Sequence, residues 1–415
     1  MFHTGLKTRI AITAILFLQC FKVLAQWGAP YANSWISYDK PFVKIAIAQK
    51  GIYKVPFASL PAGFSTSDPS KLQLWHRGKQ VAILSTSKNE ILFYAVPNDG
   101  QTDSLFYRPM SSRKNPFFSY YSDQSAYSLV NGDAAGLRAE TQNVATDPAA
   151  AQLTEATAVA QNVFLQEYSL STEYPVRPNF FNSFFELAAS KTGKVQLGQK
   201  QVPYAFTLPG LGKSGAEKAV LKLLVHGRSN NSRNIEIYVG KNDQSLRLVQ
   251  TLSNSGFAGV ETSFELKAGD VGTDGKGVLT LKSVSSDALD RFSPAYFTIT
   301  YARDLDMAGL KTITFTVPAT SSKTSRISLK NGPAGAQVLD ITNEDRQVIL
   351  SGNLSDLTFN RQTGKVANLL VTADVATVAA ANITSGKFTK PDLANADYVI
   401  ITSENLLEGA KLYAD

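Results

Sequence analysis

The chain has 415 residues, of which 44% are hydrophobic and 18% are charged, and its formal net charge is +7. This length exceeds what one hydrophobic core supports, so about three domains are expected, and the composition excludes a chain that is disordered throughout. Lys and Arg are scattered rather than gathered along one helix, which argues against nucleic-acid binding.

The first 25 residues have the pattern of an export signal. Lys7 and Arg9 precede an apolar run from Ile10 to Cys20, and Ala25 ends a short stretch suited to signal peptidase. The run is too short for the roughly twenty residues that span a membrane. Gln19 is too large for the cleavage motif of a lipoprotein. An exported chain with no transmembrane segment is therefore predicted, in the periplasm, on the outer-membrane surface or outside the cell.

Cleavage after Ala25 would change both charge and cysteine content. Residues 1–25 hold three cations and no acid, so the formal charge falls from +7 to +4. Cys20 is the only cysteine of the chain. The mature chain therefore has no disulfide, no thiolate nucleophile and no cysteine metal ligand.

Short, aromatic-rich strands are predicted across an N-terminal β domain at residues 26–132. Residues 42–47 and 52–55 are expected to form a hairpin, because Gly51 marks a turn between two alternating runs. A second turn at Arg77-Gly78-Lys79 follows the run 72–76. The other expected strands are 81–84, 90–95 and 104–107. Residues 133–161 are rich in Thr and Ala without a clear period, so a linker is predicted there.

Two further β regions are predicted, which makes the fold mainly β. Residues 162–305 are expected to form a jelly-roll-like sandwich. Its expected strands are 163–168, 201–208, 219–225, 235–239, 262–266, 277–283 and 295–301. Residues 306–392 suit a smaller immunoglobulin-like unit or a β layer docked on the α/β domain. Its expected strands are 312–317, 325–330, 337–340, 348–350, 355–359 and 368–372.

The last region, residues 393–415, has a different pattern. Residues 397–402 form a β-branched, apolar run typical of a strand buried on both faces. Ser403 is a candidate N-cap for a following helix, whose apolar residues return at helical spacing. A strand and a helix alone cannot bury their faces. The expectation is an α/β domain that is truncated soon after it begins.

Seven segments occur in an order that resembles a known family. They are residues 42–55, 72–78, 93–107, 119–127, 296–303, 338–342 and 397–402. Together they resemble gingipain-type cysteine peptidases, in particular secreted Bacteroidetes proteins related to the type IX secretion sortase. The resemblance implies a caspase-like α/β catalytic domain, protein substrates and secretion-system partners. It leaves calcium as a possible cofactor, whereas the residues themselves identify no cofactor.

Two histidines are candidate catalytic residues. His226-Gly227 matches the His-Gly pair that the family uses for its general base, but it closes an apolar strand before an ordinary turn. The matching family position falls beyond residue 415. His76 lies at another predicted turn. Both are interpreted as structural, so no catalytic, cofactor-binding or metal-binding residue is assigned.

Acidic turns and aromatic clusters have two interpretations each. Asn98-Asp99-Gly100 with Asp103 offers oxygens to calcium, but lacks a complete ligand set and is read as a turn. Residues 270–277, with Thr273-Asp274-Gly275, are read as a hairpin loop. Contiguous aromatic residues can stack sugars or pack domains together, and their contiguity favours packing. The two aromatic clusters are Phe117, Phe118, Tyr120, Tyr121 and Tyr127, and Tyr174, Phe180, Phe181, Phe184 and Phe185.

The predicted function follows from the resemblance and the missing thiolate. The chain is expected to be the non-catalytic N-terminal portion of a secreted gingipain-like cysteine peptidase, which when complete would cleave C-terminal signals from exported cargo. A degradative endopeptidase or an inactive member stays open within the same family. The alternative class is a cell-surface adhesin or carbohydrate-binding sandwich at residues 162–304.

Overall fold

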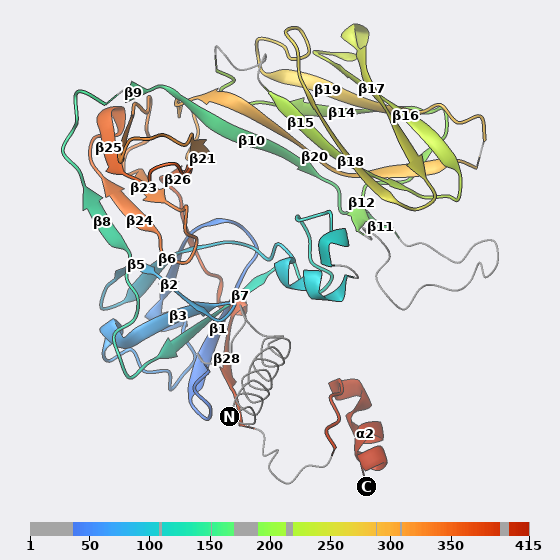
Figure 1. Ribbon diagram of the computed structural model, residues 1–415. Helices are drawn as coiled ribbons and strands as arrows, with labels where there is room; N and C mark the ends of the chain where they lie inside the picture. The colour runs from blue at the N-terminus through green and yellow to red at the C-terminus, as the bar shows by residue number, and fades with distance from the viewer. Residues whose placement is uncertain are drawn as a thin grey trace, which may run out of the picture.

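The computed structural model describes residues 36–107, 110–150, 152–169, 190–212, 219–287, 289–307, 309–390 and 398–414. The predicted export signal and the aromatic cluster from Tyr174 to Phe185 lie outside these residues. The described chain is mainly β and is divided among several separate sheets (Figure 1), as predicted. Within these ranges no helix is both long and apolar enough to cross a membrane.

Two sheets enclose the N-terminal core. One has the order β28-β1-β7-β3-β4 and the other the order β27-β2-β6-β5. The core between them takes alternate side chains of the strands, such as Val43 and Ile45 of β1 and Val55 of β2. The bounds are β1 Pro41–Ile47, β2 Gly51–Pro56, β3 Leu72–His76, β4 Lys79–Val81, β5 Ile83–Thr86, β6 Glu90–Ala95, β7 Ser125–Asn131, β27 Val375–Thr377 and β28 Ile383–Lys387.

The N-terminal region corrects two predictions and confirms one. The predicted hairpin over 42–55 is wrong, since β1 pairs with β7 and β28 while β2 pairs with β6 and β27. The two strands face each other across the core instead of sharing a ladder. The strand predicted at 104–107 is also wrong, because a 3₁₀ helix occupies Gln101–Phe106. The turn after β3 is confirmed: Arg77 and Gly78 both have positive φ, as a tight hairpin with β4 requires.

A sandwich occupies the middle of the chain. One sheet has the order β14-β19-β16-β17, and the facing layer contains β18, β15, β20 and β10. Leu223 of β15, Ile237 of β16 and Phe297 of β20 are fully buried in the core between them. The bounds are β10 Glu155–Val163, β14 Gln201–Thr207, β15 Val220–Gly227, β16 Ser232–Gly240, β17 Arg247–Ser255, β18 Gly259–Glu265, β19 Lys276–Ser283 and β20 Arg291–Asp304. Short strands β11 Glu167–Tyr168, β12 Lys191–Thr192 and β13 Gln196–Leu197 border it.

Residues 133–161 are not the linker that was expected. They contain β8 Glu140–Asn143, β9 Gln152–Leu153 and most of β10. β10 pairs with β20 along its whole length, from Glu155↔Asp304 to Val163↔Tyr296. Its buried face is made of Ala156 and Ala158. Alanine differs little from threonine in size and hydrophobicity, so the sequence does not show the alternation of buried and exposed residues that marks a strand.

The third β region continues the same large sheet. The order β18-β15-β20-β10-β21-β26-β23-β24-β8 runs from the sandwich into this region through the single pair Thr157↔Thr316 between β10 and β21. β13 pairs with β20 and is the tenth strand of this sheet. A smaller sheet, β25-β22-β9, packs on it through buried residues such as Ile327 and Phe359. The bounds are β21 Thr312–Val317, β22 Thr324–Ile327, β23 Gln337–Asp340, β24 Val348–Ser351, β25 Leu357–Asn360 and β26 Ala367–Thr372.

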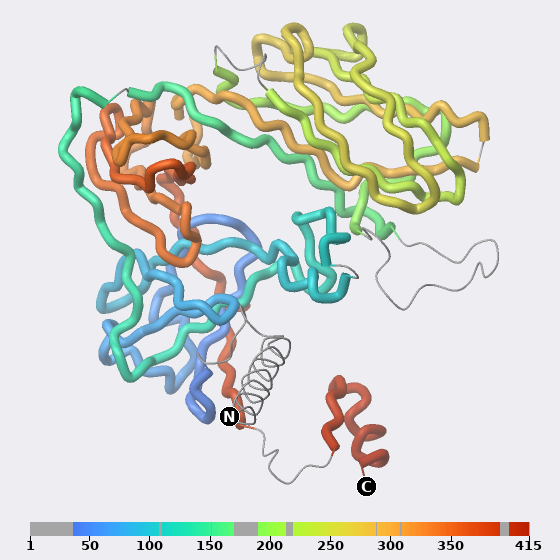
Figure 2. Tube along the Cα trace, viewed as in Figure 1, coloured from blue at the N-terminus to red at the C-terminus, as the bar shows by residue number. Residues whose placement is uncertain are grey.

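The chain returns to its N-terminal sheets near its end. β27 pairs in parallel with β2, and β28 pairs antiparallel with β1 (Figure 2). Both strands lie within the range 306–392 that was expected to form one separate unit. That range therefore contributes to two regions, because the edges of β1 and β2 need partners that nearby residues do not supply.

The C-terminal residues differ from the buried strand that was predicted. Residues 398–402 form no strand, and Ile401 is 95% exposed. The predicted helix is present as α2 Leu407–Ala414, after a 3₁₀ turn at Glu404–Leu406, but Ser403 makes no side-chain cap. No strand in the described part of the chain lies against residues 398–402, and a strand needs such a neighbour. The start of a caspase-like domain stays a prediction.

Candidate functional site

His226 is enclosed within the sandwich. It is the penultimate residue of β15, which extends beyond the predicted strand end, and it pairs with Gly259 and Ser293. Its side chain is 1% exposed and neither ring nitrogen has a hydrogen-bond partner. Burial lowers the pKa of His226 to about 3, and the nearby cations Arg228 and Lys114 act in the same direction. A substrate cannot reach this imidazole, which supports the structural interpretation.

His76 ends β3 immediately before the tight turn. Its ring stacks on Tyr127 at a centroid distance of 4.3 Å and is 8% exposed. Burial lowers the pKa of His76 to about 4, with Arg77 adding to the effect and Asp99 opposing it. The two histidines lie in different cores and share no partner, so the fold does not bring them together.

Acidic pH should therefore destabilise the protein through His76. The unfolded state binds a proton below pH 6.5, whereas the folded state does so only near pH 4, so stability falls as the pH drops between these values. Lowering the pH from 7 to 5 should cost about 2 kcal/mol through this residue. In a His76→Phe variant, which keeps an aromatic ring, the drop in the free energy of unfolding from pH 7 to pH 5 should be smaller than in the wild type by about 2 kcal/mol. Urea unfolding at the two pH values measures both drops. Equal losses would contradict the assignment.

The acidic segment near Asn98 is a turn, as predicted. Asp99 Oδ1 accepts hydrogen bonds from Gln101 N at 2.9 Å and from Arg77 at 2.6 Å, and Gly100 has a φ of 67°. Buried Asp103 accepts from Ser119 Oγ at 3.1 Å and from Tyr120 N at 2.6 Å. These oxygens bind the protein's own donors. Among the described residues no group of three His, Cys, Asp or Glu is placed to hold a metal ion.

The loop 270–277 is also held by internal contacts. Asp270 accepts from Arg247 Nε at 2.7 Å and Nη2 at 2.5 Å, and Gly272 N donates to Lys276 O at 2.8 Å. The prediction of a hairpin loop is wrong, because the strands on either side, β18 and β19, belong to different sheets and do not pair. The loop crosses between them.

The first aromatic cluster packs one region against another. Phe117 meets Tyr296 of β20 edge to face at 4.9 Å, and Tyr120 meets Tyr168 of β11 at 5.3 Å. Lys114 Nζ donates to Gly259 O at 2.9 Å beside them. Residues 114–120 thus join the N-terminal region to the sandwich. The packing interpretation is therefore confirmed for Phe117 and Tyr120, whereas Tyr121 of the same cluster is 71% exposed.

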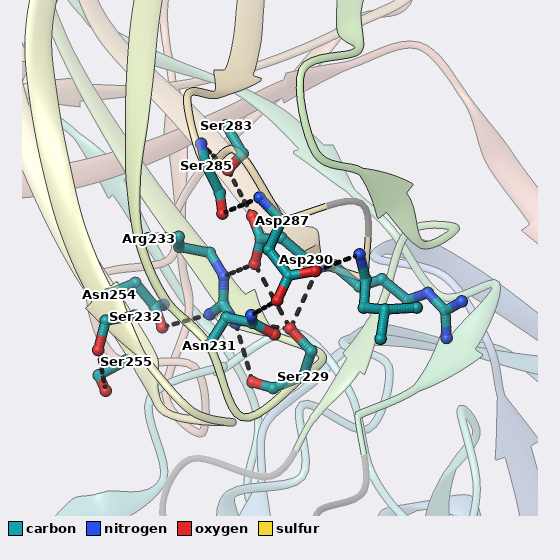
Figure 3. A network of polar contacts seen from close by, with 12 residues as sticks. Ser229, Asn231, Ser232, Arg233, Asn254, Ser255, Ser283, Ser285, Asp287 and Asp290 are labelled. Atoms are coloured by element: carbon teal, nitrogen blue, oxygen red, sulfur yellow. Dashed lines mark hydrogen bonds and ion pairs between the residues drawn. The ribbon is translucent and has the colours of Figure 1, made fainter.

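A buried ion pair organises one end of the sandwich (Figure 3). Arg233 of β16 and Asp290 are both 0% exposed, and Arg233 Nε donates to Asp290 Oδ1 at 2.6 Å. The remaining guanidinium N–H groups bond to Asn254 Oδ1, Gly256 O, and Ser229 O and Oγ, at 2.8 to 3.0 Å. Ser283 Oγ donates to Asp290 Oδ2 at 2.5 Å. No sequence signal marked this pair, because its members lie on different strands and loops.

A polar cavity of about 670 Å³ lies beside this network. Most of its lining consists of hydroxyl and amide side chains, and its one charged residue, Arg233, is already paired. Such a surface can form hydrogen bonds with a ligand, but it has no nucleophile next to a base. The hydroxyl and amide residues are Ser232, Asn234, Ser253, Asn254, Ser255, Ser285 and Ser286.

Comparison with known proteins gives a fold and no sequence family. No protein-family model matches the chain, and no curated protein matches it. Among solved structures, dimeric latent PorU from Porphyromonas gingivalis matches with a TM-score of 0.61 and 14% identity, over 91% of this chain and 36% of PorU. The chain has the fold of part of PorU. It spans about a third of the length of PorU.

Other matches are partial. A CBM36-1 domain of a xylanase from the hindgut metagenome of Trinervitermes trinervoides has a TM-score of 0.21 and 14% identity, over 34% of this chain and 95% of that domain. The tobacco streak virus coat protein has a TM-score of 0.20 and 12% identity, over 37% of this chain and 90% of the coat protein. These scores are too low to bear on function.

Proposed function

We propose that this chain is the non-catalytic, β-rich portion of an exported gingipain-like cysteine peptidase related to the type IX secretion sortase. The observation that carries the proposal is the similarity to PorU over 91% of the chain. The seven sequence segments that resemble the family, and that occur in the same order along the chain, also support the proposal. Acyl transfer by a cysteine thiolate needs a thiol and a base. Cys20 is the only thiol in the chain, and His226 is inaccessible.

The proposed role of this portion is to hold the parts of the peptidase in place. The ten-stranded sheet crosses from the sandwich to the third β region, and residues 114–120 fasten the sandwich to the N-terminal region. A frame of this kind would position a catalytic domain or guide a substrate tail. When complete, the protein would remove C-terminal signals from exported cargo.

The proposal is tested by reading the coding sequence past Asp415. We expect further strands alternating with helices, with a His-Gly pair and then a cysteine at strand ends. A stop codon with no α/β continuation would refute it. In parallel, purified residues 26–415 should show no peptide cleavage that a thiol-alkylating reagent abolishes, and the longer chain should show it.

The alternative, a carbohydrate-binding or adhesive sandwich, is favoured by one observation. The cavity of about 670 Å³ presents hydroxyl and amide groups, which suit sugar hydroxyls. A glycan array probed with the chain should then give a signal that Asn234→Ala and Ser253→Ala together abolish. A signal no higher than background would contradict the carbohydrate-binding alternative and leave the peptidase proposal as the remaining one.

A further inference from the structure

The ten-stranded sheet divides where β10 separates from β21. β10 pairs with β20 at every residue, but with β21 only through Thr157↔Thr316. Beyond this point the two strands diverge, β10 following the sandwich and β21 following the third β region (Figure 1). From Val159 to Val163, one edge of β10 therefore has no neighbouring strand within the described ranges.

The backbone groups on this open edge can be assigned. Leu305 N donates to Thr154 O, and Phe164 N donates to Ala295 O. Because hydrogen-bonded pairs alternate in an antiparallel ladder, even-numbered residues of β10 direct their N–H and C=O toward β20. Val159, Gln161 and Val163 direct theirs away from it. No backbone bond to these three groups is found in the described chain, and the Val159 side chain is 49% exposed.

The neighbouring edge of the sandwich is protected, whereas this one is not. β14 is the edge strand of the facing sheet, and Leu208 N donates to Gly275 O. The same alternation places Pro203 at an outward-facing position of β14. Proline has no N–H and blocks the addition of another strand. β10 contains no proline, so its edge can still accept an added strand.

A cavity of about 580 Å³ runs along this edge and contains a cationic group. Residues 158–162 of β10 and 312–314 of β21 contribute to its lining, and so does Arg303 of β20. The Arg303 side chain is 7% exposed and hydrogen-bonds the Tyr301 side chain, but its buried Nε has no hydrogen-bond partner. No carboxylate of the described residues forms an ion pair with Arg303. The cavity thus presents unpaired backbone groups next to an unneutralised guanidinium.

We propose that the edge of β10 from Val159 to Val163 binds an extended peptide as an added strand, with a carboxylate of the peptide paired to Arg303. Backbone hydrogen bonds supply the affinity in this mode of recognition, and the charge selects the partner. Arg303 lies opposite Ala156 in the ladder, so the carboxylate belongs at the end of the peptide nearest Thr157. This inference does not depend on the peptidase proposal.

The test uses short fluorescein-labelled peptides of alternating threonine and valine, with glutamate at the amino or the carboxyl end to allow both strand directions. Their binding to the intact chain is followed by fluorescence polarisation. One glutamate peptide should bind, and its glutamine counterpart should bind about tenfold more weakly. Gln161→Pro removes an N–H aimed at the peptide and should weaken binding about tenfold, whereas Gln161→Ala, which keeps it, should not.

Amide hydrogen exchange keeps the test decisive if proline disturbs β10. In the unaltered protein, bound peptide should slow exchange at the Val159, Gln161 and Val163 amides. Protection of these amides supports the inference. Failure of every peptide to bind, equal binding of glutamate and glutamine peptides, or protection confined to other strands would overturn it.

Discussion

Replacing Asp290 by alanine is expected to lower the free energy of unfolding by about 3–5 kcal/mol, because it leaves the Arg233 guanidinium buried without its counter-charge. Both side chains are 0% exposed, so water cannot take the place of the carboxylate. Urea unfolding measures the change. The exposed pair Asp274–Lys276 provides the control, since Asp274→Ala removes a charge that solvent already screens and one hydrogen bond from Lys276 N, and should lower stability far less than Asp290→Ala.

A double variant separates charge burial from packing. Arg233→Met with Asp290→Ala removes both charges, so it should be more stable than Asp290→Ala alone. If the single and double variants were equally destabilised, the cost would come from lost packing rather than from the stranded charge. That result would contradict the role assigned to the ion pair.

Gly227→Ala is expected to destabilise the sandwich by about 3 kcal/mol. A Cβ at this position would overlap the carbonyl oxygen of Gly256 and Nη1 of Arg233. The oxygen belongs to the backbone, so the loop would have to move and the bonds of Arg233 would weaken. Gly227 is thus required for close packing, whichever role its His-Gly pattern suggests.

Gly256→Ala is the matched control for this prediction. Gly256 has a φ of 59°, but a Cβ there would meet no atom within 4 Å. Its substitution should cost only the strain of a left-handed residue, about 1 kcal/mol. Thermal unfolding of the two variants would compare them directly. A larger loss for Gly256→Ala would show that backbone conformation, rather than overlap, limits this loop.

The strands that could be predicted are those with large alternating side chains. Residues 42–47, 72–76 and 235–239 all lie within observed strands, because Val, Ile and Leu mark the buried face clearly. β10 was missed because its buried face is alanine. Pairing was harder to predict than strands: the run 42–55 contains two strands, but nothing local shows that they belong to different sheets.

The polar features could be predicted only where they are local. The turn at Asn98 follows from residues adjacent in sequence, and its hydrogen bonds confirm it. The pairing of Arg233 with Asp290 depends on the packing of β16 against a distant loop, which no spacing reveals. No local sequence pattern marks Arg303 as a binding residue. Its importance arises from the divergence of β10 and β21, a property of the assembled sheets.

The pairing of β1 with β28 determines when the N-terminal region can finish folding. Pro41 meets Lys387, and the entire sandwich is encoded between them. During synthesis, the outer edges of β1 and β2 stay uncovered until β27 and β28, which end at Lys387, have emerged, and uncovered edges invite aggregation. Chains shortened before Val375 should therefore be insoluble even though their first strands are intact. Late closure would also suit the export proposed for this chain.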